Sequence, residues 1–231
     1  MAKDSILLID SKVNSLDLSR TLAAGESLSL QLVNLDRTAP LRIAGQITLE
    51  PGAHLRLLEV DLGRFSAEVN LTVTCLEEAS FDADIAALNE GSESKVYAFN
   101  VIHIGRRSAS LTSMRGVCSD TSRMEFLGSS DIRRGAAKTH TRQEGKIVNL
   151  SGRAKCIASP SLLISEEDVY ASHGASMGSV PDADMFYLMS RGLTRQAAER
   201  LITVGYLKPA CELIADEEVK ERALALLESE L

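Results

Sequence analysis

The sequence lacks tryptophan, and aromatic residues fill only 4% of its 231 positions. Its core must therefore be built mainly from leucine, isoleucine, valine and alanine. Basic residues are also fewer than acidic ones, 25 against 32, which gives a net charge of −7. Because a protein that clamps nucleic acid needs a basic face for the phosphates, this balance argues against that class.

Cysteine is scarce and scattered along the chain. The four cysteines form no CxxC pair and are Cys75, Cys118, Cys156 and Cys211. This spacing fits reduced thiols better than a secreted disulfide framework. The start, MAKDSILLIDSKVNSLD, is charged and has no long apolar run, which predicts neither a signal peptide nor a membrane span. We expect a cytoplasmic protein.

Up to about Ser179, apolar residues recur with a period of two, which predicts short strands separated by turns. The alternating residues are Leu28, Leu30 and Leu32, then Leu41, Ile43, Ile47 and Leu49, then Leu55 and Leu57, then Val69, Leu71, Val73 and Cys75. No helix is needed in this part of the chain. A run of strands without crossover helices is either antiparallel or coiled as a solenoid.

Small residues open successive strands at a nearly regular spacing of about 14, or about 27 for two strands. They are Ala53, Ser66, Ala79, Ser94, Ser108, Ser122, Ala136 and Ala154. Such a repeat suggests stacked rungs, because one rung cannot bury its own apolar face whereas stacked rungs share a core. From periodicity alone, an antiparallel sandwich is an equal alternative to the β-solenoid.

After Val180 the pattern becomes helical, which predicts a β-rich core at 1–179 and a helical domain at 180–231. A first helix is predicted to start at Pro181 and stop at Gly192, and a second is predicted to be capped by Thr194 and to stop at Gly205. Pro209 opens a short third segment, and Asp216 caps the last helix. The apolar run Phe186–Met189 is interpreted mainly as core packing against the end of the β-region. Arg191 is placed to bind carbonyls at a helix C-terminus or to meet an acidic partner.

One segment of this sequence resembles a known family. The stretch DVYASHGASMGSVPDADMFYLMSRGLTRQAAERLITVGYL, Asp168 to Leu207, closely resembles the C-terminal signature of the SufB/SufD proteins of iron–sulfur cluster assembly. The preceding RQEGKIVNLSGRAKCIASPSLLISEEDV, which starts at Arg142, is also similar to the family. The resemblance is therefore close from Arg142 to Leu207. Earlier in the chain the agreement is limited to strand character and turn spacing.

The resemblance implies a right-handed parallel β-helix followed by a small helical domain. It also implies a non-enzymatic scaffold subunit that dimerises through its β-helix, with itself or with a SufB/SufD-like chain. The helical end, from Thr194 to Leu227, would dock a SufC-like ABC ATPase. The one Gly-Lys pair, Gly145-Lys146, lacks the rest of a phosphate-binding loop, so any ATP chemistry must come from the partner.

Departures from the family pattern make the chain look like a short, minimal, SufD-like member. SufB-type members have a cysteine in a late rung and a glutamate just after the histidine of the SHG turn. Here Gly174 follows His173, and Gly145 stands where the cysteine would be. Cys156 lies 11 positions further on.

Two residues are the candidate ligands for a transient iron–sulfur cluster, since iron in such clusters is bound by thiolate or imidazole. His173 lies in the family-matched turn, where the alternative is a histidine that only ties the turn to the helices. Cys156 is the second candidate, with a small buried hydrophobe as the alternative. Cys75 and Cys118 are interpreted as core residues, and Cys211 is placed in a helix outside the β-helix. Three acidic residues could supply a carboxylate ligand but are interpreted as solvated: Glu144, Glu166 and Glu167.

Other chemistries find little support in the sequence. His54, His103 and His140 show no HxH or HxxxH spacing, so no preformed mononuclear metal site is expected. Neighbouring Ser172 and His173 would point to opposite faces of a strand and could not form a catalytic dyad.

Two readings of the function besides the cluster scaffold stay open. The first is a β-helical interaction module that docks the ATPase without holding a cluster. The second is a β-helical enzyme acting on polysaccharide, but the low aromatic content makes this the poorest of the three.

Overall fold

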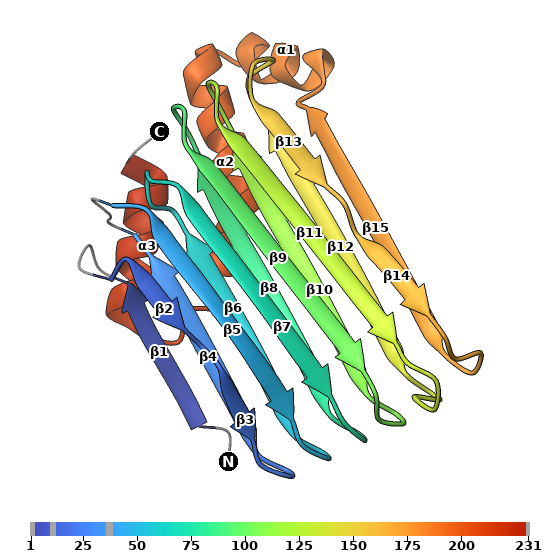
Figure 1. Ribbon diagram of the computed structural model, residues 1–231. Helices are drawn as coiled ribbons and strands as arrows, with labels where there is room; N and C mark the ends of the chain where they lie inside the picture. The colour runs from blue at the N-terminus through green and yellow to red at the C-terminus, as the bar shows by residue number, and fades with distance from the viewer. Residues whose placement is uncertain (1–2, 10–12, 36–38, 230–231) are drawn as a thin grey trace.

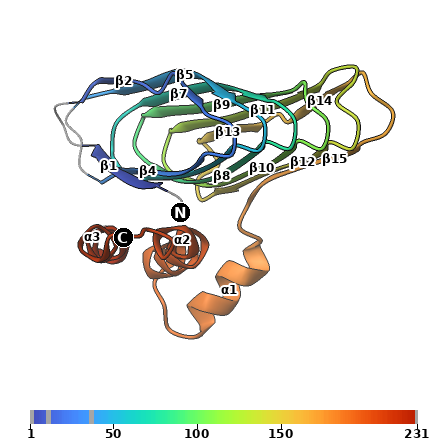
Figure 2. The ribbon, with the colours of Figure 1, turned by 90° about the horizontal axis from the view of Figure 1, so that it is seen from below.

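The computed structural model describes residues 3–9, 13–35 and 39–229. The chain coils into a parallel β-solenoid of about six turns, and helices follow it (Figure 1). Each full turn adds one strand to each of two facing sheets, which enclose a flattened interior when seen end-on (Figure 2). Every strand pairing is parallel, so the solenoid is confirmed and the antiparallel sandwich is excluded.

The strands divide between the two sheets in an alternating order. Sheet A contains, in spatial order, β1 (Lys3–Ile9), β4 (Ser27–Asn34), β6 (His54–Asp61), β8 (Ser80–Asn89), β10 (Ala109–Cys118), β12 (His140–Asn149) and β15 (Tyr170–Ser179). Sheet B contains β2 (Ser15–Asp17) and β3 (Arg20–Leu22), then β5 (Leu41–Leu49), β7 (Ala67–Cys75), β9 (Ser94–His103), β11 (Arg123–Ile132), and last β13 (Lys155–Ala158) and β14 (Ser161–Ile164).

The register shows the repeat directly. In the early turns of sheet A, Ser27 pairs with His54 and His54 pairs with Ser80. In the later turns Ala109 pairs with His140, a slightly longer step along the chain. The predicted two-strand repeat is therefore confirmed. Most of the small residues that define it are buried at strand entries, as for Ala53 and Ala79.

The interior of the solenoid holds the main hydrophobic core. All of the alternating residues predicted to point inward, from Leu28 to Cys75, are buried in this core. Because successive residues of a strand point to opposite faces, the same strands present a second row of side chains outward. The two rows are called the inner row and the outer row below.

Helices follow the solenoid; the second and third pack against the outer face of sheet A, and the first packs against the second (Figure 2). They are α1 (Asp182–Ser190), α2 (Arg195–Cys211) and α3 (Glu217–Ser229). A second hydrophobic cluster joins the outer row of sheet A, including Val33, Leu58 and Val60, to Leu207 and Ile214 of the helical segment. Burial against this sheet is what holds the short helices in place.

Several predicted helix signals are confirmed. The Thr194 hydroxyl accepts a hydrogen bond from the Ala197 backbone N–H at 3.1 Å, and Asp216 accepts one from Val219 at 3.0 Å. Gly192 ends the first helical segment with a φ of +95°, a backbone conformation that favours glycine. Pro181 was predicted to be the first helical residue but is the N-cap, one position before α1 begins at Asp182.

The predicted break between Gly205 and Pro209 is wrong, since α2 continues through both residues to Cys211. Pro209 lies in the last turn of the helix, and the carbonyl that its missing N–H would have bonded belongs to Gly205. Burial of Leu207 and Ala210 against sheet A offsets the lost backbone hydrogen bond.

The interpretation of Phe186–Met189 as core is also wrong for most of that run. Phe186, Tyr187 and Met189 are 74%, 55% and 44% exposed, and Met185 is the buried residue of α1. Helix α1 packs against α2 and leaves these side chains in solvent. The Arg191 guanidinium lies 5.1 Å from the Tyr187 ring centre, a cation–π contact.

The change from strand to helix falls where the sequence pattern changes. The last strand ends at Ser179 and α1 begins at Asp182. Met1 and Leu231, the outer limits of the two predicted units, lie outside the described residues. No helix in the described part of the chain is long and apolar enough to cross a membrane.

Candidate functional site

The candidate site is the end of the solenoid formed by its last turn. Strand β15 is the final strand of sheet A, and β13 and β14 are the final segments of sheet B (Figure 1). Along β15, nearly every side chain is exposed. We call this face, made by β13, β14 and β15, the open end.

His173 lies on β15 and is exposed at the open end. It is in register with Gln143, a buried inner-row residue of the preceding strand. The imidazole therefore belongs to the row that faces inward in earlier turns, but no further turn covers it in the described chain. Ser172 pairs with Arg142 and belongs to the opposite row, as expected for neighbours on a strand.

Apolar side chains are also exposed at the open end. Leu163 and Ile164 of β14 are 56% and 50% exposed, and Tyr170 and Met177 of β15 are 70% and 49% exposed. The Tyr170 ring also contacts His140, with 4.7 Å between ring centres. An exposed edge strand with apolar side chains is the kind of surface that pairs with another chain.

The structure does not bring the two predicted ligands together. Cys156 lies on β13, and the nearby Ala158 N–H contacts the Met177 sulfur of β15 at 2.8 Å. Met177 and His173 are separated by roughly 13 Å of strand. The strands of the two sheets run in opposite directions. Cys156, which precedes Ala158, therefore lies beyond the Ala158–Met177 contact when seen from His173. Within one chain the two residues therefore occupy separate places.

Cys156 instead faces Cys118, the last residue of β10. A hydrogen bond between the two thiols lowers the pKa of Cys156 and, together with burial, raises the pKa of Cys118. Cys118 is fully buried and Cys156 is partly exposed. The interpretation of Cys75 and Cys118 as core residues is confirmed. Cys211 lies in α2, as predicted, and is buried.

The interior also contains a buried ion pair. The Lys95 ammonium donates hydrogen bonds to Asp61 Oδ1 at 2.9 Å and to the carbonyls of Gly63 and Leu88, each at 2.7 Å. Tyr97 donates to the other Asp61 carboxylate oxygen at 2.8 Å. All three ammonium hydrogens thus have acceptors. A charged group can be buried only when its hydrogen bonds are satisfied in this way.

Glu59 lies near this ion pair and is also buried. Among the described residues, no hydrogen-bond partner reaches its Oε2 atom. Burial first, and the neighbouring Asp61 charge second, raise the pKa of Glu59 to about 8. The side chain therefore carries a proton at neutral pH.

A second polar network fills the later turns. His103 contacts Ser108 at 2.9 Å and Ser110 at 3.0 Å through its two ring nitrogens. Hydroxyl contacts continue through Thr141 at 2.7 Å and on to Ser130 at 2.9 Å. Gln143 then joins Ser130 at 2.8 Å, which brings the network to the inner-row neighbour of His173. Burial lowers the pKa of His103 to about 4, so it is neutral at pH 7.

Sequence reasoning missed these interior groups. Every second residue of β9 points inward, and the apolar ones, Tyr97, Phe99 and Val101, already mark the inner row. Lys95 and His103 lie in the same row, one at each end. Reading Lys95 and His103 in phase with Phe99 and Val101 would have placed both inside.

The acidic residues named as possible ligands have other contacts. Glu144 pairs with Arg142, and Glu166 accepts a hydrogen bond from the Gly135 N–H at 2.9 Å. Backbone hydrogen bonds, that of Gly135 first, lower the pKa of Glu166. In the described ranges no group of three or more histidine, cysteine or acidic residues is placed to hold a metal ion.

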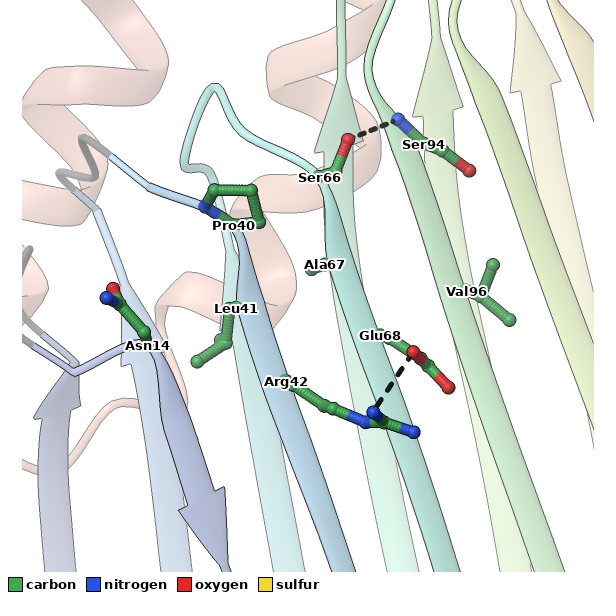
Figure 3. Close-up of a pocket in the computed structure, with 9 residues that line it drawn as sticks. All are labelled: Asn14, Pro40, Leu41, Arg42, Ser66, Ala67, Glu68, Ser94 and Val96. Atoms are coloured by element: carbon green, nitrogen blue, oxygen red, sulfur yellow. Dashed lines mark hydrogen bonds and ion pairs between the residues drawn. The ribbon is translucent and has the colours of Figure 1, made fainter.

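A depression of about 490 Å³ lies on the outer face of sheet B, in the early turns (Figure 3). In it, Arg42 and Glu68 reach toward one another at 3.7 Å, and the Ser66 hydroxyl accepts a hydrogen bond from the Ser94 N–H at 3.0 Å (Figure 3). Its lining contains neither a thiol nor an imidazole. It therefore offers none of the soft or borderline ligands that the open end and the interior carry.

The fold and the site define a parallel β-solenoid protein with an exposed histidine and an unpaired edge at its last turn. Residues 29–206 match the family described as SUF system FeS cluster assembly, SufBD core domain. The chain belongs to this SufB/SufD family.

Individual relatives agree with this assignment. The chain is 35% identical over 147 residues to the iron–sulfur cluster assembly protein SufD of Bacillus subtilis. The matched region covers 64% of the chain and 34% of that protein. It is 32% identical over 109 residues to SufD of Escherichia coli, covering 47% of the chain and 26% of that protein. The matched regions thus span about a third or less of these relatives.

Proposed function

We propose that this chain is a scaffold subunit in iron–sulfur cluster assembly and that the nascent cluster is its cargo, not a resident cofactor. The observation that carries the proposal is the His173 imidazole, exposed on the last strand of a SufBD core. Imidazole nitrogen is a suitable iron ligand, and an exposed one can both take up and release its metal. This role requires no bond-making step by the chain itself, so the proposal is of a protein that is not an enzyme.

The open end supports a dimer in this proposal. One imidazole fills one coordination position, so the remaining ligands come from a second chain or from the cargo's own sulfide. The unpaired edge of β15, flanked by Tyr170 and Met177, provides backbone groups and apolar surface for a second SufB/SufD-like chain or a second copy. Cys156 as a second ligand stays a prediction, because its thiol faces Cys118 in the solenoid.

The helical segment supports a second contact. Leu201 of α2 and Leu213 after it are 52% and 43% exposed, within the region from Thr194 to Leu227 where a SufC-like ABC ATPase is expected to dock. The helices cover sheet A on the side away from the interior (Figure 2), so this surface and the open end can be occupied together. The ATPase supplies the nucleotide chemistry in this arrangement.

Anaerobic reconstitution tests the scaffold role. The purified chain, with and without a SufB-like partner, receives ferrous iron and sulfide, and both elements are then measured per chain. We expect His173→Ala to abolish retention of iron and sulfide while His54→Ala leaves it unchanged. His54 is a matched control because it is also an exposed imidazole of sheet A, in an early turn. Equal retention by wild type and His173→Ala would overturn the proposal.

One observation favours the alternative of an interaction module that docks the ATPase without holding a cluster. The two predicted ligands lie in separate places, since Cys156 faces Cys118. Light scattering and ATPase rates with the SufC-like ATPase of the same organism distinguish the readings. A stable complex combined with full function of His173→Ala would favour the module, and no complex would contradict both.

A further inference from the structure

Two cysteines from opposite sheets meet inside the solenoid. Cys118 ends β10 of sheet A, and Cys156 is the second residue of β13 of sheet B. They are far apart in the sequence, but both pack into the main core, and each thiol shifts the pKa of the other. Both side chains belong to the inner rows that pack into the main core.

The stacking of turns explains why they meet. After Cys118 the chain makes a short turn and re-enters the interior with Met124 of β11. Cys156 pairs with Met124 in the next turn of sheet B. A Cβ atom at Gly116 would overlap the Met124 sulfur, so the two sheets approach closely here. Cys118 is thereby held diagonally opposite Cys156, one turn away.

The surroundings of the two thiols differ. Cys118 is fully buried and is near the Ser122 hydroxyl and the Lys95 ammonium. Cys156 is partly exposed, and its strand is the terminal one on that side of sheet B in the described chain. A small solute can therefore reach Cys156 from the open end, whereas Cys118 is shielded from solvent.

We propose that Cys156 and Cys118 are a redox-active dithiol that closes to a reversible intrachain disulfide when the protein meets hydrogen peroxide. Cys156 is the attacking thiol and Cys118 the resolving thiol. This inference does not rest on the proposed function, because it needs neither iron nor a second chain. The resulting bond would link β13 of the last turn covalently to β10.

The chemistry proceeds in two balanced steps. The Cys156 thiolate sulfur attacks one oxygen of the peroxide, the O–O bond breaks, and the released hydroxide takes up the proton that Cys156 gave up. Cys156 is then a sulfenic acid. The Cys118 sulfur attacks the Cys156 sulfur, the S–O bond breaks, and the hydroxyl leaves as water with the Cys118 proton. Two electrons from the dithiol have reduced one peroxide to two waters, and a thiol reductant returns them.

The other cysteines provide internal references. Cys75 is buried in the inner row of β7, and Cys211 is buried at the end of α2. Neither faces a second thiol among the described residues. Peroxide treatment should therefore leave both in the thiol form while Cys118 and Cys156 react.

The experiment treats the reduced full-length chain with hydrogen peroxide, counts thiols in denaturant and maps peptides without reductant. We expect the wild type to lose two of its four thiols, with one linked peptide pair containing Cys118 and Cys156 and lighter by two hydrogen atoms. Dithiothreitol should restore all four. An unchanged thiol count in the wild type would overturn the proposal, and this measurement depends on no variant.

Two substitutions separate the roles of the thiols. In Cys118→Ser, Cys156 should stop at the sulfenic acid, which dimedone traps. In Cys156→Ser, the three remaining thiols should persist, because Cys118 is not accessible. A linkage between Cys156 residues of two chains, or over-oxidised Cys156 beside a free Cys118 in the wild type, would contradict the assignment.

Discussion

The early and late turns of the solenoid share one backbone plan but are filled differently. The early interior is apolar and includes Leu30, Leu57, Val69, Leu71 and Val73. The late interior combines apolar residues such as Met124 and Phe126 with many polar ones, including Ser110, Ser130, Thr139, Thr141 and Gln143. The parallel hydrogen-bond ladder of sheet A continues through both regions.

The outer faces differ as well. From β4 to β10, α2 and the residues after it cover part of sheet A, and Gln31 bonds the Leu213 carbonyl at 3.2 Å and the Ala215 N–H at 2.9 Å. In the last two strands, β12 and β15, the same sheet carries exposed residues such as Arg142 and Ser172. The strands up to β10 are thus partly covered, while β12 and β15 keep most of their outer surface free.

This difference shows that the backbone hydrogen bonds between strands and the stacking of turns define the fold. The side chains inside each turn can be apolar or polar without changing it. An apolar interior stabilises by burial, at about 25 cal/mol per Å². A polar interior contributes only where its hydrogen bonds are complete, and it suffers more when one partner is removed. The predictions below test this contrast from the largest expected effect to the smallest.

Lys95 lies where the apolar and polar turns meet. We expect Lys95→Met to lower the free energy of unfolding by about 3–5 kcal/mol, because the Asp61 carboxylate would be left buried without its cation. Urea denaturation followed by circular dichroism measures the loss. The exposed Lys146→Met is the control, with an expected change within about 0.5 kcal/mol. Equal stability of the two variants would show that the pair contributes nothing.

A matched pair of substitutions compares the two kinds of interior. Leu71→Ala in the early turns should cost about 2–5 kcal/mol by leaving a cavity. Thr141→Val in the late turns should cost about 1–3 kcal/mol, because the hydroxyls of Ser110 and Ser130 lose their partner while volume is kept. The same urea titration measures both. A negligible cost for Thr141→Val would mean that the late network is replaceable by apolar packing.

The pH dependence of stability separates Glu59 from His103. Glu59 has an ordinary pKa of 4.5 and a folded pKa of about 8, so the folded state holds the extra proton and stability falls as pH rises between these values. His103 has an ordinary pKa of 6.5 and a folded pKa of about 4, so stability falls as pH drops through that window. The two slopes oppose each other between 4.5 and 6.5.

Above pH 6.5 the His103 effect no longer opposes that of Glu59. We expect the wild type to lose about 2 kcal/mol between pH 6.5 and 8, at about 1.4 kcal/mol per pH unit. Glu59→Gln should show no such decline, since the amide does not ionise. Urea titrations at several pH values check this, and parallel curves for the two proteins would contradict the burial of a protonated Glu59.

The smallest expected effect concerns the outer faces. Gln31→Ala should cost about 1–2 kcal/mol, because it removes both hydrogen bonds that join β4 to the segment between α2 and α3. Arg142→Ala on the bare late face should change stability by less than about 1 kcal/mol, since its ion pair with Glu144 is exposed. Thermal melting of both variants tests the contrast, and similar losses would remove the distinction between covered and bare faces.

Much of the fold was predictable because burial and alternation are local. The inner row from Leu28 to Cys75 follows from a period of two, and the caps at Thr194 and Asp216 follow from side chains that bond nearby N–H groups. The break at Pro209 was predicted wrongly because packing on sheet A outweighed a local signal. Phe186 and Tyr187 were misplaced because apolar character alone does not say whether a surface covers them.

The candidate site was predictable only in part. The resemblance pointed to His173, but the distance between His173 and Cys156 depends on which strands face each other across the interior. The meeting of Cys118 with Cys156 depends on turn lengths between rungs, which the repeat did not fix. Lys95 was missed because a charged residue on a strand ordinarily faces solvent.

The even length of the turns has a consequence for how the chain reaches this structure. Paired residues on neighbouring strands of sheet A, such as His54 with Ser80 and Ala109 with His140, are separated by roughly an eighth of the chain. The entropy cost of closing the loop is therefore nearly the same for each added strand, and each turn should be added at a similar rate. Folding can begin at any inner turn and spread both ways, and the strand that carries His173 is then laid down on a template already built.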